Sequence, residues 1–332
     1  MHIFNLDTKF EEMNKLLYIV ILLTISTLGF SQPVPNVEEN IPHLMTFGLK
    51  AETSWGDDDF SQAFFFLIPE AYNQPFFIRV FDPDTGGEVD EIAGEFDTRC
   101  VYEVFGGEGA WTEDDAKETD PYGNYKSGTL LASRAFTENP RYDNGWYSFG
   151  PFNPAQGEYV DYYEGYIFKI ICEGVSGDDG NMYRYFLSTE DNENRPIEGS
   201  NAFAYEYSFR MHNDNQEVAH IYPYVEEGTI WVKVMNFDWD ADGDIMAISV
   251  QRQGQSMEVS GEDHWTEGRL TIQDEEIGTS FDFRFVKSKN LVRNNNVVVN
   301  VRNQFDEAMP FYTTPIGGVP KYKGEVEFIP IE

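Results

Sequence analysis

The sequence is poor in basic residues. Among its 332 residues, 23 are lysine or arginine and 58 are aspartate or glutamate, so the formal net charge at pH 7 is −35. A protein that binds nucleic acid needs clustered positive charge to displace the counterions of the phosphates. This composition therefore excludes nucleic acid as the partner, and it disfavours an anionic membrane surface for the same reason.

Cysteine is nearly absent as well. Neither Cys100 nor Cys172 has a second cysteine or a histidine at the spacing of a zinc site, which argues against a cysteine-based zinc centre. In an exported chain both residues would meet an oxidising compartment, so we predict a disulfide between them, on neighbouring strands. Two buried free thiols are the alternative.

Recognisable catalytic motifs are also lacking. The sequence contains no Gly-x-Ser-x-Gly elbow, no His-Glu-x-x-His pair and no phosphate-binding Gly-x-x-x-x-Gly-Lys loop. A pair of carboxylates for glycoside hydrolysis stays open as an alternative, because any two of the many acidic residues could lie at a suitable separation. These absences favour a protein that is not an enzyme.

Long apolar runs are limited to one, from Leu16 to Phe30, which follows Lys15. Its length falls short of the ~20 residues of a membrane-spanning helix and fits an export signal. Acidic residues before Met13 are unusual in the basic start of such a signal, so we expect Met13 to be the true start. We predict a signal at 1–32, no membrane span in the mature chain, and a location in the periplasm, at the cell surface or outside the cell.

Aromatic residues, in contrast, are plentiful at 16 % of the chain, and they favour β-strands. Short apolar segments bounded by Gly, Asp or Asn predict strands at Phe76–Phe81, Ile230–Met235 and Val297–Val301. Phe281, Phe283 and Phe285 alternate with polar residues, which is the period of a half-buried strand. No segment after residue 32 has the pattern of a long amphipathic helix, so the chain is predicted to be all-β.

An internal repeat divides the chain. Phe-Asp-x-Asp ends an apolar run at Phe81–Asp84 and again at Phe237–Asp240, and Trp-Thr-Glu follows at Trp111 and at Trp265. Landmarks that recur in the same order at a domain-sized period indicate tandem domains. We predict two internally repeated antiparallel β-sandwich, jelly-roll-like modules at 33–190 and 203–332, joined by a linker at 191–202.

Acidic residues gather directly after the predicted strands, in loops that contain glycine. Calcium takes six to eight hard oxygen ligands, usually carboxylates and carbonyls of irregular loops, so these loops predict calcium sites; solvated acidic loops are the alternative. If Met182 corresponds to Met309, Asp306 takes the place of Asp179. The predicted ligands are Asp82, Asp84, Asp90, Asp178 and Asp179 in the first module and Asp238, Asp240, Asp242, Asp244 and Asp306 in the second.

The segment Asp238–Asp244 resembles the first half of an EF-hand loop, although Ser249 stands where the final glutamate is expected. The Asp-x-Asp pair after a strand also resembles the calcium loops of C2-type and jelly-roll sandwich modules of exported proteins. The resemblance covers only these loops and implies calcium binding by a β-sandwich.

These features together predict an exported, calcium-stabilised binding protein of the cell envelope or the extracellular space, whose partner is an envelope or surface protein. A carbohydrate-binding protein and a glycan-acting hydrolase are the alternatives. Trp55, Trp146 and Tyr147 are candidates for a platform that stacks on a sugar ring, with packing in the core as the alternative role.

Overall fold

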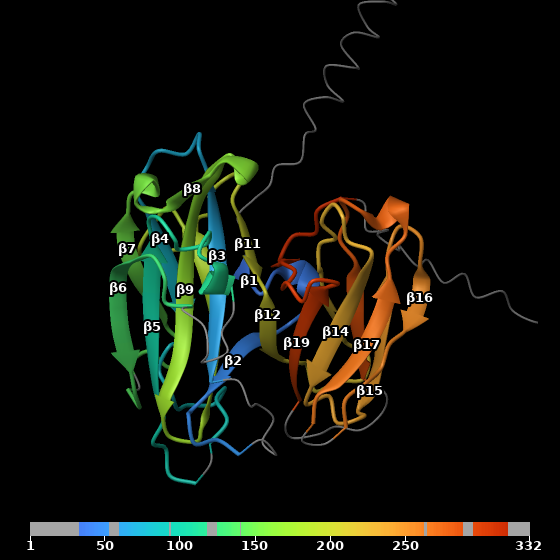
Figure 1. Cartoon of the computed structure of the whole chain (residues 1–332). Helices are drawn as coiled ribbons and strands as arrows, with labels where there is room; N and C mark the ends of the chain where they lie inside the picture. The colour runs from blue at the N-terminus through green and yellow to red at the C-terminus, as the bar shows by residue number, and fades with distance from the viewer. Residues whose placement is uncertain are drawn as a thin grey trace, which may run out of the picture.

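The computed structural model describes residues 33–52, 60–92, 94–117, 125–139, 141–261, 264–287 and 295–317. Within these ranges the regular elements are β-strands and short 3₁₀ turns, joined by loops, which confirms the predicted all-β class (Figure 1). The strands form three antiparallel sheets. The predicted export signal and Trp55 lie outside the described residues. The turns are η1 (Val37–Glu39), η3 (Asp114–Lys117), η4 (Pro154–Gln156), η5 (Asp161–Tyr163) and η6 (Asp274–Glu276).

The largest sheet has nine strands and runs through both halves of the chain. Its order is β17-β14-β19-β12-β2-β10-β4-β7, with β1 paired to β10. Strands β12 and β2 join the two halves, because Phe209 pairs with Leu44 and Arg210 with His43. The strands are β1 (Pro33–Val34), β2 (His43–Phe47), β4 (Phe76–Phe81), β7 (Trp146–Phe152), β10 (Gly180–Ser188), β12 (Glu206–Arg210), β14 (Trp231–Phe237), β17 (Thr266–Thr271) and β19 (Asn296–Asn303).

Two smaller sheets complete the fold. A seven-stranded sheet has the order β20-β11-β3-β9-β5-β6, with β8 paired to β9, and a four-stranded sheet has the order β13-β18-β15-β16. The seven strands are β3 (Ser61–Pro69), β5 (Arg99–Gly106), β6 (Thr129–Phe136), β8 (Glu158–Val160), β9 (Gly165–Ser176), β11 (Asn201–Ala204) and β20 (Phe311–Tyr312). The four strands are β13 (Val218–Ile221), β15 (Gly243–Ile248), β16 (Gln253–Ser256) and β18 (Asp282–Lys287).

The strands predicted from apolar patterns are present. Phe76–Phe81 is β4, Val297–Val301 lies within β19, and the alternating phenylalanines lie in or beside β18. The segment predicted at Ile230–Met235 is β14, which begins at Trp231 and continues to Phe237. The two added residues are paired, since Asn236 and Phe237 lie opposite Val299 and Val298 of β19.

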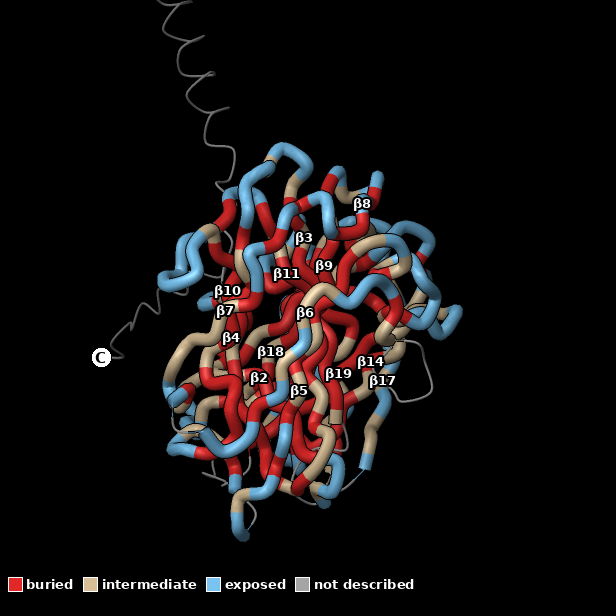
Figure 2. The backbone as a smooth tube through the Cα atoms, turned by 90° about the vertical axis from the view of Figure 1, so that its left-hand side faces the viewer, coloured by how far each residue is buried: buried red, intermediate tan, exposed pale blue. Residues whose placement is uncertain are grey.

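The main hydrophobic core fills the space between the sheets, in a sandwich-like arrangement. Phe64 of β3 packs on Tyr185 of β10 with ring centroids 5.8 Å apart, and Phe209 of β12 packs on Phe285 of β18 at 5.5 Å. One contiguous cluster contains buried residues of both halves. Figure 2 shows these buried strands in the centre and exposed loops at both ends. Burial of this apolar surface is the main source of stability.

A second apolar cluster lies on the other face of the seven-stranded sheet. Along β3, Phe64 and Phe66 face the main core, whereas Phe65 belongs to the second cluster with Ile167 of β9 and Phe203 of β11. This alternation follows from the period of two along a strand. The second face of the seven-stranded sheet is therefore covered around β3, β9 and β11, in part by Trp111 and by Tyr163 of η5.

The two cysteines lie on adjacent strands, as predicted, but the predicted disulfide is not formed: both are buried free thiols. Tyr102 of β5 lies opposite Cys172 of β9, and Cys100 lies opposite Gly174. The cysteines are therefore diagonal neighbours, and diagonal Cβ atoms are farther apart than the ~3.8 Å of a disulfide. A hydrogen bond with Cys172 and burial raise the pKa of the Cys100 thiol well above its usual range.

Candidate metal centre

The loop after β4 begins with a sharp turn. Asp82 has a φ of 55°, a left-handed conformation that aspartate tolerates better than most residues. Its N–H donates to the carbonyl of Gly145 over 2.8 Å, so the loop is joined to the turn before β7. The side chain of Asp90 then accepts hydrogen bonds from the N–H groups of Gly86 and Met182, each over 2.7 Å. Asp90 therefore holds the loop against β10.

Three carboxylates meet at this end of the sheet. Asp82, Asp84 and Asp143 each place an oxygen within 4.8 Å of the other two. Asp84 is fully buried and Asp82 is 1 % exposed. No well-aligned hydrogen-bond donor among the described residues reaches either oxygen of Asp84 or the Oδ1 atom of Asp82; the N–H of Asp84 itself and a proton shared with Asp143 are the weaker partners that act on Asp84. A buried carboxylate without partners costs several kcal/mol, so this arrangement calls for a compensating proton or cation.

The electrostatics of the three residues agree with that requirement. Burial and the neighbouring carboxylate of Asp143 raise the pKa of Asp84 to about 7. Burial is also the main cause that raises the pKa of Asp82 to about 6, and the Arg184 guanidinium opposes the rise. That guanidinium stacks on the ring of Phe81 at 4.2 Å instead of forming an ion pair with the cluster. At neutral pH the cluster therefore keeps negative charge, which Arg184 offsets only in part, and no direct ion pair to it forms among the described residues.

A glycine leaves room beside the cluster. Gly87 has a φ of 94°, and a Cβ atom on it would lie 3.2 Å from the Cγ atom of Asp143. A side chain at this position would be strained and would crowd the carboxylate. Hard oxygen donors on an irregular loop are the ligands that calcium prefers, because its coordination is flexible and of high number. The residues present therefore fit a calcium ion.

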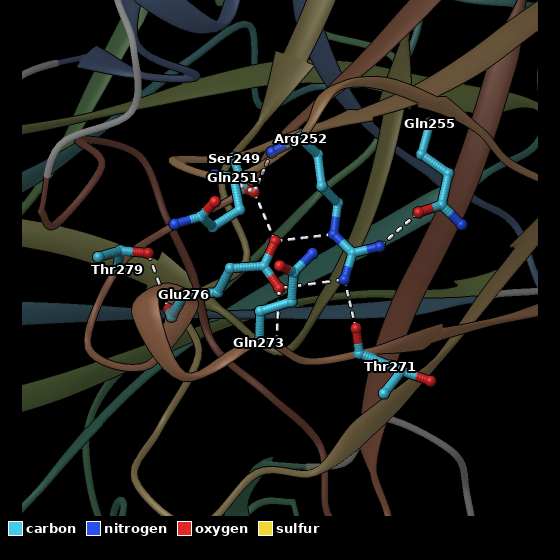
Figure 3. Close-up of polar contacts among 8 residues, drawn as sticks. All are labelled: Ser249, Gln251, Arg252, Gln255, Thr271, Gln273, Glu276 and Thr279. Carbon is cyan, nitrogen blue, oxygen red and sulfur yellow. Dashed lines mark hydrogen bonds and ion pairs between the residues drawn. The ribbon is translucent and has the colours of Figure 1, made fainter.

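A buried carboxylate of the second half shows the contrast. Glu276 is fully buried, and its oxygens accept from Arg252 Nε over 2.7 Å and from the N–H of Gln273 over 2.9 Å (Figure 3). Ser249 also donates to it, over 2.5 Å. Burial raises the pKa of Glu276, but these hydrogen bonds outweigh burial and hold it below its usual value. Glu276 is a satisfied structural carboxylate, whereas Asp84 is not.

The predicted ligands Asp178 and Asp179 join a different group. They lie with Asp97, and an oxygen of each is within 4.8 Å of the others. Asp179 is buried, and it accepts from the N–H groups of Asp97 and Thr98 over 2.9 and 3.0 Å. Asp97 is exposed. This group is therefore partly satisfied by backbone and open to solvent, and it makes a weaker candidate than the Asp84 group.

The aspartates of the second-half loop are arranged differently. Asp238 and Asp240 both have positive φ values, and Asp240 and Asp244 are exposed. Asp242 lies 4.0 Å from the Nζ atom of Lys287, whose side chain is completely buried. No group of three ligand atoms forms in this loop within the part of the chain that the structure describes. Lys287 is the last residue of β18, far from this loop in the sequence. The residues around the loop therefore did not reveal its positive charge.

Asp306 does not approach Asp238. Strands β14 and β19 are antiparallel, with Val232 opposite Asn303 and Phe237 opposite Val298. Asp306 follows the end of β19 and therefore lies beside the start of β14, whereas Asp238 follows the end of β14. Asp306 instead pairs with Lys233, 3.1 Å from its Nζ atom. We expected Asp306 to correspond to Asp179 and to lie near Asp238. Asp306 lies instead at the opposite end of β14.

The candidate sugar platform is not a single surface either. Trp146 and Tyr147 are adjacent residues of β7, so their side chains point to opposite faces of the sheet. Tyr147 packs on Phe136 at 5.3 Å, and Trp146 packs on Phe81 at the same distance. The guanidinium of Arg79 covers the Trp146 ring at 5.0 Å. The Trp146 and Tyr147 rings therefore cannot form one platform for a sugar ring.

Two ligand candidates, Asp143 and Asp97, were missed from the sequence. Asp143 stands in Asp143-Asn144-Gly145, a turn sequence directly before β7, and Asn144 has the positive φ typical of such turns. The turn could have been recognised, but its contact with the loop after β4 depends on the pairing of β4 with β7.

A scan against protein-family models finds no match, and a search of curated proteins finds none. No helix in the described ranges is long and apolar enough to cross a membrane.

Proposed function

We propose that the chain is an exported, non-enzymatic binding protein whose first half is stabilised by calcium at Asp82, Asp84 and Asp143. The observation that carries the calcium proposal is the Asp84 carboxylate, which is fully buried and has no well-aligned hydrogen-bond donor among the described residues. The two other carboxylates lie within 4.8 Å of it. A divalent cation would neutralise this charge, and nearby backbone carbonyls could complete the coordination.

Calcium is preferred over magnesium because of the loop geometry. Magnesium demands a near-ideal octahedron and releases its waters reluctantly, whereas calcium accepts irregular sets of carboxylates and carbonyls. The ligands here come from two separate turns, and one of them has a left-handed backbone at Asp82. Such a set suits the more adaptable ion.

We also infer that the two halves are tandem jelly rolls. The order β2-β10-β4-β7 in the first half has its counterpart in β12-β19-β14-β17, and β3-β9-β5-β6 has its counterpart in β13-β18-β15-β16. Numbered along each half, without β1, β8, β11 and β20, the strands take the same positions in both halves. Jelly rolls pair two such sheets through Greek-key connections. The internal sequence repeat supports the same conclusion.

Export and the binding role rest on the sequence. The apolar run at Leu16–Phe30 supports an export signal, and the absence of recognisable catalytic motifs in the sequence supports a binding role. The partner would be an envelope or surface protein or a glycan, at the cell envelope or outside the cell.

The calcium proposal is tested by thermal unfolding of the mature chain with EDTA and with millimolar calcium. A ligand that binds only the folded state stabilises it, by about 2.7 kcal/mol at a hundredfold excess over its dissociation constant. The melting temperature should therefore rise by roughly 5–10 °C. Asp84→Asn should abolish the rise, and Asp244→Asn, at an exposed position, should preserve it. A rise that survives Asp84→Asn would place the ion elsewhere, and no rise at all would refute the proposal.

A further inference from the structure

Strand β17 forms one edge of the nine-stranded sheet. It stands at the end of the strand order, and β14 is its sole partner strand among the described residues (Figure 1). An edge strand has backbone N–H and C=O groups along one side that can pair with a further strand. The four-stranded sheet ends in β16, which has four residues and a register shift between Ala247 and Ile248 of its partner. Short length and irregular pairing protect such an edge, whereas β17 has six regularly paired residues.

The two faces of β17 differ in character. Leu270 is 2 % exposed and faces the core, whereas Arg269 is exposed on the other face. Gly268 shares the core face with Leu270 and has no side chain to cover it. The nearest atom to a Cβ atom on Gly268 would be the Cγ atom of Glu258, at 3.6 Å, which is ordinary van der Waals contact. The edge therefore has an apolar side with room at Gly268 and a cationic side at Arg269.

Arg269 is the outermost of three basic residues in one row. It lies opposite Lys233 of β14, which lies opposite Arg302 of β19. Strands are about 4.8 Å apart, and like charges directly opposite each other destabilise a sheet. Asp306 accepts from Lys233 over 3.1 Å and, through its carbonyl, from Arg302 over 2.8 Å. Arg269 stacks on the Trp231 ring at 3.7 Å, and no carboxylate of the described residues forms an ion pair with it.

The last part of the sequence has the pattern of one more strand. Residues 318–332 lie outside the described residues, and within them 325–329 reads Glu-Val-Glu-Phe-Ile between a glycine and a proline. The two glutamates alternate with Val326 and Phe328, which is the period of a strand with one acidic and one apolar side. These two sides complement the two sides of the β17 edge.

The described chain ends close enough for this segment to reach β17. A Cβ atom on Gly317 would lie 3.0 Å from the Cα atom of Thr279, whose hydroxyl donates to the carbonyl of Glu276 over 2.8 Å. One nitrogen of Arg252 donates to the Glu276 carboxylate and to the carbonyl of Thr271, the last residue of β17 (Figure 3). Only Glu276 and this guanidinium therefore separate the two points. The connecting residues 318–324 span up to about 23 Å.

We propose that residues 325–329 add to the edge of β17 as an antiparallel strand, with Glu327 opposite Arg269. The segment arrives at the end where β17 finishes, so it runs in the opposite direction. Its glycine and proline then flank a paired region as long as β17. In this register Glu327 joins the row of cations and offsets their repulsion. Phe328 lies opposite Gly268, where an aromatic ring covers the strand beside an edge glycine. The added strand closes an edge that is otherwise open to another chain.

Amide hydrogen exchange of the mature full chain, measured by mass spectrometry on the peptide that contains β17, tests the pairing. Val326→Pro removes an N–H and disrupts an added strand, so the β17 amides that face the edge should exchange about tenfold faster or more. Tyr322→Pro, in the connecting residues, is the matched control and should leave their exchange unchanged. Glu327→Lys should also speed exchange, and Glu327→Lys combined with Arg269→Glu should restore protection.

A cysteine pair tests the register and the number of chains. Directly opposite residues have Cβ atoms about 4.5–5.5 Å apart, close to the spacing of a disulfide. Thr271→Cys with Glu325→Cys should therefore cross-link within one chain on mild oxidation. The rate should exceed that of Thr271→Cys with Glu332→Cys by about tenfold or more, since the register places residue 332 about 23 Å farther along. The native cysteines are buried and do not compete.

Each result decides the proposal. Equal exchange in the parent protein and Val326→Pro would overturn it, and so would equal cross-linking of the two cysteine pairs. A covalent dimer as the main product would assign the added strand to a second copy of the chain and would also overturn it. The circular dichroism spectrum of Val326→Pro serves as the folding check. The inference is independent of the proposed calcium site, because Val326→Pro should retain the calcium-induced rise in melting temperature and Asp84→Asn should retain the protection of β17.

Discussion

Asp84 and Asp143 place carboxylate oxygens within 4.8 Å of each other, although one follows β4 and the other precedes β7. The register of these strands explains the approach, since Phe81, at the end of β4, lies opposite Trp146, at the start of β7. The two carboxylates therefore lie on loops that are anchored to paired strands. The like charges are therefore held together by the sheet, and this is the physical basis of the calcium proposal.

Asp143→Asn should reduce the calcium-induced rise in melting temperature, because it removes one anionic ligand from the cluster. With EDTA the same variant should melt at or above the temperature of the parent protein, because a repulsive charge is gone. Asp97→Asn is the matched control from the other acidic group, and it should leave the calcium response unchanged. Thermal unfolding followed by circular dichroism measures all of these. If Asp97→Asn lost the response and Asp143→Asn kept it, the ion would belong to the Asp179 group.

Glu39 should make stability fall as the pH rises. Burial raises the pKa of this carboxyl from 4.5 to about 8, and its oxygens accept from Tyr207 and from the N–H of Asn36 over 2.8 and 2.5 Å. Between pH 4.5 and 8 the folded state thus keeps a proton that the unfolded state has lost. The free energy of unfolding should therefore decrease with rising pH, by about 3 kcal/mol between pH 5.5 and 8.

Glu39→Gln tests this dependence, because the amide is neutral at every pH in the range. Urea unfolding at pH 5.5 and at pH 8 should show a smaller difference for the variant than for the parent protein. An unchanged difference would show that other groups cause the pH dependence. The variant Glu38→Gln, at the exposed neighbouring position, serves as the control.

Arg252→Met should destabilise the second half strongly. It removes a cation from the fully buried Glu276 and leaves that charge partly uncompensated, which costs about 3–5 kcal/mol. Arg252→Met combined with Glu276→Gln should recover part of the loss, since the stranded charge is then gone as well. Chemical denaturation of the parent, both single variants and the double variant gives the coupling energy. Additive effects would mean that the contact in Figure 3 contributes nothing.

Both thiols should resist alkylation in the native protein. Cys100 and Cys172 are fully buried, and the pKa of Cys100 is raised, so access and thiolate fraction are both low. Iodoacetamide labelling followed by mass spectrometry should show little modification in buffer and two modified cysteines in denaturant. Absence of labelling in denaturant, restored by a reductant, would instead reveal a disulfide.

Much of the fold could be read from local sequence, because the side-chain period of a strand is a local property. The phenylalanines around β18 and the apolar segments of β4, β14 and β19 revealed their strands in this way. The Asp-x-Asp pair after β4 was also visible, and it supplied two of the three carboxylates at the candidate centre. The turn Asp143-Asn144-Gly145 was equally local but had no visible link to that pair.

The sequence by itself determined the all-β class, the acidic loops and the repeated landmarks. The tertiary structure alone decided which acids meet: Asp143 joins Asp84, Asp97 joins Asp179, and Asp306 moves to Lys233 at the other end of β14. It also brought Lys287 to Asp242 and made the two cysteines diagonal instead of opposite. The reason is that strand pairing and register bring together residues far apart in the chain, and neither is set by the residues of one segment.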